Sequence, residues 1–119
     1  MKKLVRKPVH PSRRIVISRH QFGFRVRPGT LRVDLAFGLG RTFRLTNLSG
    51  FPVAVVFPNT LNVEDVNGRP VVRFNLPDGA DKDLTVRNRR TGRHEYAVTI
   101  PEVRIEASGH SRPDIEIVR

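Results

Sequence analysis

Apolar and polar residues alternate along most of this chain, and that spacing is typical of β-strands with one buried face. Successive side chains of a strand point to opposite faces of a sheet, so each alternating segment places apolar residues on a core and polar residues in water. The residues that this pattern predicts to face the core are Phe22, Phe24, Val26, Leu31, Val33, Leu35, Phe37, Phe43, Leu45, Val72, Phe74, Leu76, His94, Tyr96, Val98, Ile100, Ile115 and Ile117.

Two apolar segments, residues 53–57 and 15–17, do not alternate, and we expect them to form strands covered on both faces. No window has the period of an amphipathic helix. Turn-forming pairs separate the predicted strands. Among them Asn67-Gly68 predicts a tight hairpin with a type I′ turn, which needs positive φ at both residues. Short strands at this spacing predict an all-β sandwich or barrel.

A chain of 119 residues is the size of one domain. Residues 1–12 contain two prolines and four cations, and we expect a flexible basic arm there, followed by a domain over residues 13–119. The absence of cysteine excludes disulfides and thiolate metal sites, and it fits a reducing compartment. The basic start lacks the apolar segment of a signal peptide, and no apolar run could span a membrane, so we expect a cytoplasmic protein without a membrane partner.

Two segments carry a resemblance to a known family. Residues 47–57 read Asn-Leu-Ser-Gly-Phe-Pro-Val-Ala-Val-Val-Phe, a strand that ends in asparagine, then a short loop and an apolar strand. Residues 92–98 read Gly-Arg-His-Glu-Tyr-Ala-Val and precede the closing strand at residues 114–118. This order resembles the cupredoxin-like β-sandwich over about residues 13–118. The resemblance implies a single antiparallel sandwich, and the strand pattern alone leaves an immunoglobulin-like Greek key open.

The same resemblance excludes the family's copper chemistry. Cupredoxins have a histidine ligand where this chain has Val53 and a cysteine ligand where it has Val98. A blue copper site needs a thiolate and two imidazoles. The chain contains no cysteine, and its single methionine is Met1, so it cannot hold type 1 copper.

No segment carries a catalytic or metal-binding signature. Residues 78–83 contain three aspartates without the spacing of a calcium loop, and Gly38-Leu39-Gly40 is not followed by the helix that a phosphate-binding loop needs. We interpret both segments as turns. The four histidines, which have no metal-ligand spacing, are His10, His20, His94 and His110. We therefore expect a protein that is not an enzyme and that has no metal and no cofactor.

Positive charge is concentrated in the first third of the chain. Residues 1–44 contain twelve Lys or Arg against one acid, Asp34, and so carry the whole net charge of +11, whereas residues 45–119 contain ten of each sign. This asymmetry favours a polyanionic partner. If the alternating strands are neighbours, their arginines form a basic sheet face beside the arm. The residues predicted to bind a polyanion are Lys2, Lys3, Arg6, Lys7, Arg13, Arg14, Arg25, Arg27, Arg32 and Arg44.

These observations leave three functional interpretations. The first is a binding module that engages a polyanion such as nucleic acid through phosphates. This binding would be independent of sequence, because the phenylalanines are predicted to face the core and leave no outward aromatic for stacking on bases. The second is a structural or assembly subunit that docks on an acidic protein partner. The third, a hydrolase or cofactor enzyme, is disfavoured because no catalytic motif supports it. The alternative interpretation of the arginines themselves is a solvated charged face without a partner. The sequence does not indicate an oligomeric state.

Overall fold

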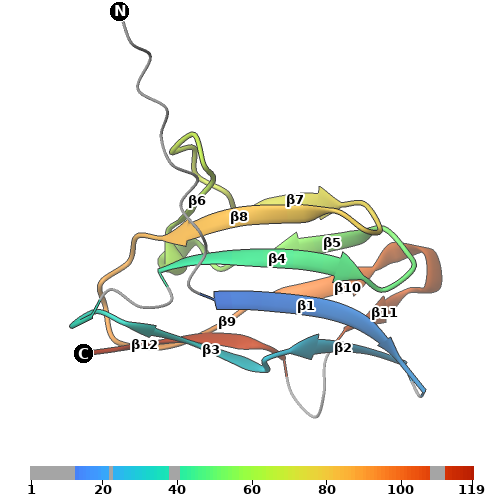
Figure 1. Cartoon of the computed structure of the whole chain (residues 1–119), viewed down its shortest axis with the longest axis horizontal. Helices are drawn as coiled ribbons and strands as arrows, with labels where there is room; N and C mark the ends of the chain where they lie inside the picture. The colour runs from blue at the N-terminus through green and yellow to red at the C-terminus, as the bar shows by residue number, and fades with distance from the viewer. Residues whose placement is uncertain (1–12, 22, 38–40, 108–111) are drawn as a thin grey trace, which may run out of the picture.

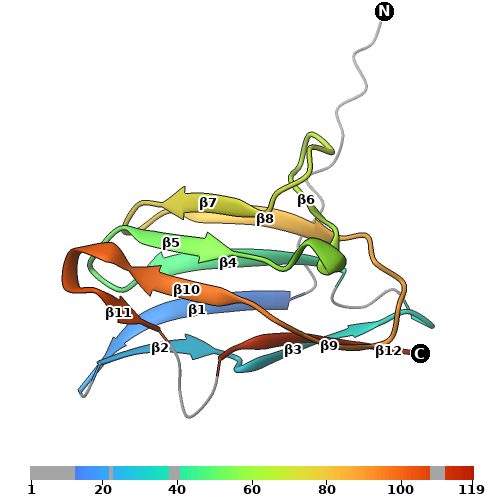
Figure 2. The same ribbon diagram turned by 180° about the vertical axis from the view of Figure 1, so that it is seen from behind.

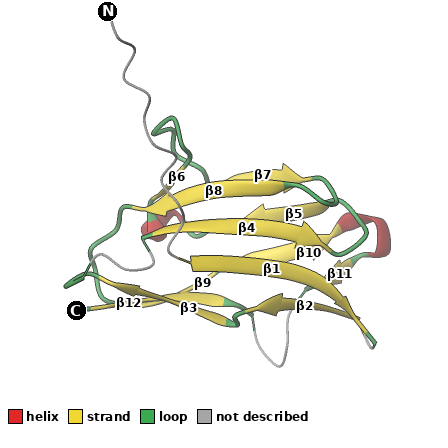
Figure 3. Cartoon of the chain, in the orientation of Figure 1, coloured by secondary structure: helices red, strands yellow, loops and turns green. Residues whose placement is uncertain are grey.

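The computed structural model describes residues 13–21, 23–37, 41–107 and 112–119, in which strands joined by loops are the dominant secondary structure (Figure 3). The strands are β1 (Arg13–His20), β2 (Gly23–Arg27), β3 (Thr30–Asp34), β4 (Thr42–Leu48), β5 (Val53–Val56), β6 (Val63–Glu64), β7 (Arg73–Leu76), β8 (Asp81–Val86), β9 (Gly92–Glu95), β10 (Ala97–Ile100), β11 (Ile105–Glu106) and β12 (Asp114–Val118). Two 3-10 helices, η1 (Asn59–Leu61) and η2 (Pro101–Val103), are the only helical segments of the described residues. The all-β prediction is confirmed. The predicted arm at residues 1–12 and the turn at 38–40 lie outside the description.

The strands form two packed layers, with β1, β4 and β8 in front of β5 and β10 in Figure 1 and behind them in Figure 2. The first layer is a five-stranded sheet with the order β2-β1-β4-β8-β6. The second contains a four-stranded sheet, β11-β10-β5-β7, and a three-stranded sheet, β3-β12-β9. Tyr96 N–H donates a 3.0 Å hydrogen bond to Pro113 O between the β9–β12 and β10–β11 ladders, and this bond joins the two sheets into one layer.

At two places a connection of only one or two residues carries the chain from a strand of one sheet to a strand of another. Strand β2 pairs with β1 in the first layer, whereas β3, which follows Pro28-Gly29, pairs in parallel with β12 in the second. Strand β9 pairs with β12 and β10 pairs with β5, with Tyr96 between the two strands. Strands β1 and β4 are also parallel, so two strand pairs depart from the predicted antiparallel arrangement.

The core lies between the layers and consists mainly of residues that the alternation predicts to face inward. Phe24 and Phe74 are half-buried and pack against it. The predicted core residues that the structure buries are Val26, Leu31, Val33, Phe43, Leu45, Leu76, Tyr96, Val98, Ile100, Ile115 and Ile117. For every strand that contains these residues, the period-two pattern therefore predicted correctly which face is buried.

The prediction was wrong for two residues that lie beyond the end of a strand. Phe37 is 78% exposed, because β3 ends at Asp34, whose Oδ1 accepts a 3.0 Å hydrogen bond from Ala36 N–H and turns the chain. Val72 is 43% exposed, because β7 begins only at Arg73.

The prediction that residues 53–57 and 15–17 are covered on both faces was also wrong. In β5, Val53 and Val55 are buried, while Ala54 and Val56 are only half-buried, as in a strand with one covered face. Strand β1 alternates in the same way around Val16. Each strand lies inside its layer between two neighbours. These neighbours shield the outer valines from the side, so an apolar run does not require a further layer above it.

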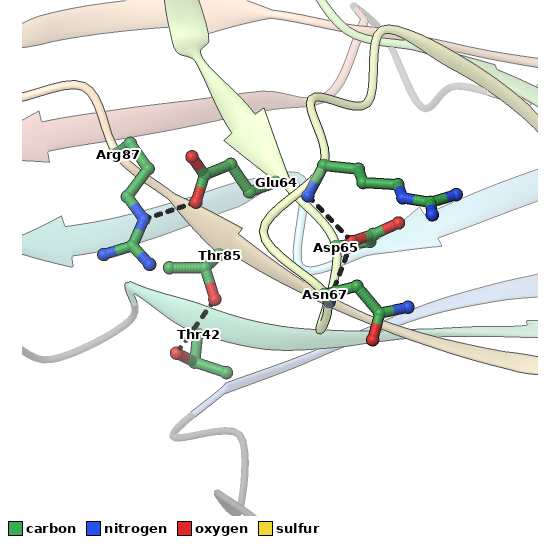
Figure 4. A network of polar contacts seen from close by, with 7 residues as sticks. Thr42, Glu64, Asp65, Asn67, Thr85 and Arg87 are labelled. Atoms are coloured by element: carbon green, nitrogen blue, oxygen red, sulfur yellow. Dashed lines mark hydrogen bonds and ion pairs between the residues drawn. The ribbon is translucent and has the colours of Figure 1, made fainter.

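The hairpin predicted at Asn67-Gly68 is present, but its turn is not type I′. Gly68 has a φ of 77°, whereas Asn67 is not among the non-glycine residues with positive φ. Gly68 N–H donates to Asp65 O, and the Asp65 carboxylate accepts hydrogen bonds from the backbone N–H groups of Arg69 and Asn67 (Figure 4). These hydrogen bonds hold the pKa of Asp65 below its usual range, and the bond from Arg69 has the largest effect. The turn therefore has one left-handed residue, Gly68, and the Asp65 carboxylate stabilises it by accepting hydrogen bonds from backbone N–H groups.

The side chain of Asn47 joins the two layers at the end of the sandwich where β4 stops. It is fully buried, and its Nδ2 donates to Leu76 O at 2.9 Å and to Phe51 O at 2.7 Å. Its Oδ1 accepts hydrogen bonds from the backbone N–H and the hydroxyl of Ser49, at 3.0 and 2.7 Å. One amide thus fixes both the loop that leads into β5 and the end of β7.

We predict that Asn47→Ala destabilises the fold by about 3 kcal/mol, because it removes the side-chain donor to Leu76 O and the acceptor of the Ser49 backbone N–H in a buried position. Chemical denaturation measures the change. Asn75→Ala, at an exposed position of β7, is the control and should change stability by less than about 0.5 kcal/mol. Equal effects of the two substitutions would show that the buried hydrogen bonds do not hold this end together.

We predict that Val98→Asp destabilises the protein by roughly 4 kcal/mol or more, because Val98 is fully buried and an aspartate there would be an unpaired carboxylate among apolar side chains. The matched control is Val66→Asp, at a valine that is 69% exposed. Thermal unfolding of both variants tests the prediction. An unchanged melting temperature for Val98→Asp would contradict the burial of β10.

Candidate functional site

The outer face of the first layer collects four of the predicted arginines. The register places Arg25 and Arg27 of β2 opposite the outward residues of β1, and it pairs Arg14 of β1 with Arg44 of β4. Directly paired residues lie on the same face of a sheet. Arg14, Arg25, Arg27 and Arg44 therefore share the face that points away from the core.

The strands that carry this face have arginines and no acidic residue. Strands β2, β1 and β4 are neighbours, and their arginines are Arg13, Arg14, Arg19, Arg25, Arg27 and Arg44. Within the described residues, the five arginines of β1 and β2 form no ion pair, and the undescribed residues contain no Asp or Glu that could supply one. We call Arg14, Arg25 and Arg27, together with Arg13 and Arg19 at the ends of β1, the basic β1–β2 surface.

Arg19 was missing from the predicted set. It has the inward register of Ile17, but it lies near the end of β1, where it is exposed. Lys2, Lys3, Arg6 and Lys7 of the predicted set lie outside the described residues.

Arg44 shares the face but is already neutralised. Its Nε donates to Asp83 Oδ1 at 2.8 Å and its Nη2 donates to Asp83 Oδ2 at 3.2 Å, a two-point pairing across β4 and β8. The hydrogen bond and charge of Asp83 raise the pKa of Arg44 above its ordinary value. A guanidinium held in this way has fewer free donors for a ligand, so Arg44 contributes less to a polyanion surface than its position suggests.

At the opposite edge of the same sheet, near β6, acidic side chains are present and form ion pairs with arginines. Glu64 of β6 accepts a 2.6 Å hydrogen bond from Arg87 Nε, and next to this pair the hydroxyls of Thr42 and Thr85 lie 3.4 Å apart (Figure 4). The outer face therefore changes from unpaired arginines at the β2 edge to balanced pairs at the β6 edge.

Arg32 does not belong to this surface, which corrects the prediction that its strand neighbours β2 and β4. It lies on β3 in the second layer, where the register pairs it with Glu116 of β12. Glu116 also accepts a 2.9 Å hydrogen bond from Arg93 Nε. The outer face of the second layer is thus mixed in charge around Arg32.

Outward aromatic side chains are nearly absent from the basic β1–β2 surface, as predicted, but not from the whole chain. Phe24 is half-buried and meets Phe51 edge-on, with ring centroids 5.8 Å apart. Phe37, which was predicted to face the core, is exposed after the end of β3 and so belongs to the second layer.

The positions that resemble copper ligands are filled by apolar packing. Val53 and Val98 are buried in the adjacent strands β5 and β10. Tyr96, two residues before Val98, packs with its ring centroid 5.4 Å from that of Phe57, and its hydroxyl has no hydrogen-bond partner among the described residues. Burial, with a smaller effect of the Asp114 charge, raises the pKa of Tyr96 above its ordinary value, so the phenol stays protonated at neutral pH.

No group of three or more His, Cys, Asp or Glu that could hold a metal occurs among the described residues. The aspartates of residues 78–83 instead serve the fold. Asp78 Oδ1 accepts a 2.9 Å hydrogen bond from Gly50 N–H in a turn, as predicted, whereas Asp81 and Asp83 lie in β8. His94 is half-buried in β9.

This arrangement of two layers, with strand switches and two parallel pairs, is a cupredoxin-like β-sandwich. Among solved structures the chain is similar to a novel purple cupredoxin from Nitrosopumilus maritimus, with a TM-score of 0.51 and 18% sequence identity over 88% of this chain and 98% of that chain. At this identity the likeness establishes the fold, which confirms the predicted resemblance. No family model and no curated protein matches the sequence. Within the described residues, no helix is long and apolar enough to cross a membrane.

Proposed function

We propose that this protein is a non-enzymatic binding module that engages the phosphate backbone of nucleic acid through the basic β1–β2 surface, without sequence preference. The observation that carries the proposal is that strands β2, β1 and β4 are contiguous and contain no acid, so five arginines of residues 13–27 are left without ion pairs among the described residues. Elsewhere in the described chain, Arg44, Arg87, Arg93 and Arg112 are paired with carboxylates, whereas Arg69, Arg73 and Arg104 also form no ion pair.

Unpaired arginines on a flat sheet favour contacts with phosphate rather than with bases. A guanidinium forms two-point hydrogen bonds with phosphate oxygens. Base reading requires either side chains that enter a groove or aromatics that stack. The half-buried Phe24 does not supply an open stacking platform on this surface. Binding of this kind releases counterions and weakens steeply as salt concentration rises.

We predict that the triple variant Arg14→Gln, Arg25→Gln, Arg27→Gln lowers the log–log salt slope of DNA binding by about two to three, since each lost phosphate contact reduces it by roughly 0.9. The control has the same loss of charge at exposed arginines outside this surface: Arg69→Gln, Arg73→Gln, Arg104→Gln. Fluorescence anisotropy with oligonucleotides of several sequences, titrated at several salt concentrations, measures both slopes.

Equal slopes for the two triple variants would contradict a localised site, and no binding by the intact protein at low salt would refute the proposal. In the second case an acidic protein partner becomes the leading interpretation. Removal of residues 1–12, which contain Lys2, Lys3, Arg6 and Lys7, should lower the slope further if these cations also contact phosphates.

A further inference from the structure

A second basic feature lies at the end of the sandwich where β4 begins. A cleft of about 300 Å³ opens there, and the described residues that line it are Leu35, Ala36, Arg41, Arg89 and Arg119. Figures 1 and 2 both show the end of β3, the connection from β8 to β9 and the C-terminal end of β12 gathered at this end. The volume is at the lower limit of small-molecule sites.

No acidic side chain compensates the charge that lines the cleft. Three arginines and no Asp or Glu line it among the described residues, and none of the three takes part in an ion pair there. The undescribed residues contain no Asp or Glu. The Nε of Arg41 is buried and has no hydrogen-bond partner. A buried donor without a partner is costly, so the Arg41 side chain would gain a hydrogen bond by turning this donor toward an acceptor placed in the cleft that it lines.

Backbone hydrogen bonds hold the walls of the cleft in place. Arg41 O accepts a 2.7 Å bond from Val86 N–H, which anchors the start of β4 to the end of β8. Leu35 N–H donates to Val118 O at 2.9 Å, which brings the segment after β3 beside Arg119. The arginine side chains are not needed for these contacts, so they are free to bind without loss of the frame.

We propose that this cleft binds the phosphate group of a small phosphorylated molecule. One carboxylate cannot neutralise three guanidinium groups or accept all of their hydrogen bonds. A phosphate monoester carries nearly two negative charges and three acceptor oxygens, so it matches the three groups better. Leu35 and Ala36 add an apolar wall on which the organic part of a monoester can pack. The site uses none of the arginines of the basic β1–β2 surface, so it does not depend on the proposed nucleic-acid binding.

The test is a titration of the intact protein with inorganic phosphate, phenyl phosphate and benzoate at physiological salt. Calorimetry measures the affinities, and NMR spectra record the Arg Nε–H resonances during the titration. We expect phenyl phosphate to bind most tightly and benzoate most weakly, and we expect the Arg41 Nε–H resonance to shift on binding. Equal affinity for phenyl phosphate and inorganic phosphate would identify free phosphate as the ligand of the same site. Tighter binding of benzoate than of either phosphate would overturn the proposal.

Arg41→Gln and Arg89→Gln should each weaken phenyl phosphate binding about tenfold or more, since each removes charge-assisted hydrogen bonds. The matched control is Arg73→Gln, at an exposed arginine of β7, which should leave affinity unchanged. Arg89 is exposed, so its variant keeps the test valid if Arg41→Gln fails to fold. No measurable binding by the wild type, or an equal loss in Arg73→Gln, would refute the site. Neither result would change the salt dependence predicted for DNA binding by the basic β1–β2 surface, so the two proposals are tested separately.

Discussion

The hydrogen bonds of the buried Asn47 side chain fix one end of the sandwich. They tie β4 of the first layer to Leu76 of the second and to the loop that enters β5. The backbone of Asn47 adds two further bonds, donating to Ala80 O and accepting from Gly79 N–H, so the turn before β8 depends on the same residue. Val53, which is buried, pairs with Leu76 in the second layer, so an amide network and apolar packing together hold this end of the sandwich.

The sequence predicted the faces of the strands well because burial in a sandwich has a local period. It could not predict which strands pair. The alternation of His94, Tyr96, Val98 and Ile100 runs without a break, yet the structure divides the segment between β9, paired with β12, and β10, paired with β5. A change of partner leaves the inward and outward order of side chains intact, so it leaves no trace in the pattern. Phe37 shows a second limit of the method. The alternation of apolar residues continues as far as Phe37, although β3 ends at Asp34 and Phe37 is exposed.

The sequence predicted the candidate sites only in those features that a single strand determines, such as which side chains point outward. Alternation places Arg25 and Arg27 outward, but the neutralisation of Arg44 depends on Asp83, which is distant in sequence and adjacent in the sheet. Arg32 has the same local pattern and lies in the other layer. The cleft is the extreme case. Its arginines come from the start of β4, the segment after β8 and the end of β12, and no spacing in the sequence connects them.

The topology converts an asymmetry along the sequence into an asymmetry across the surface. In the first layer, β1 has only β2 and β4 as neighbours, and all three strands come from residues 13–48, which contain the acid-poor part of the chain. The single acid of that part, Asp34, lies on β3, which Pro28-Gly29 separates from β2 and which pairs in the second layer. The arginines of β1 therefore have no carboxylate on any adjacent strand. Arg44, one strand further in, lies opposite Asp83 of β8 and is paired with it. The unpaired charge on β1 is thus a consequence of strand order.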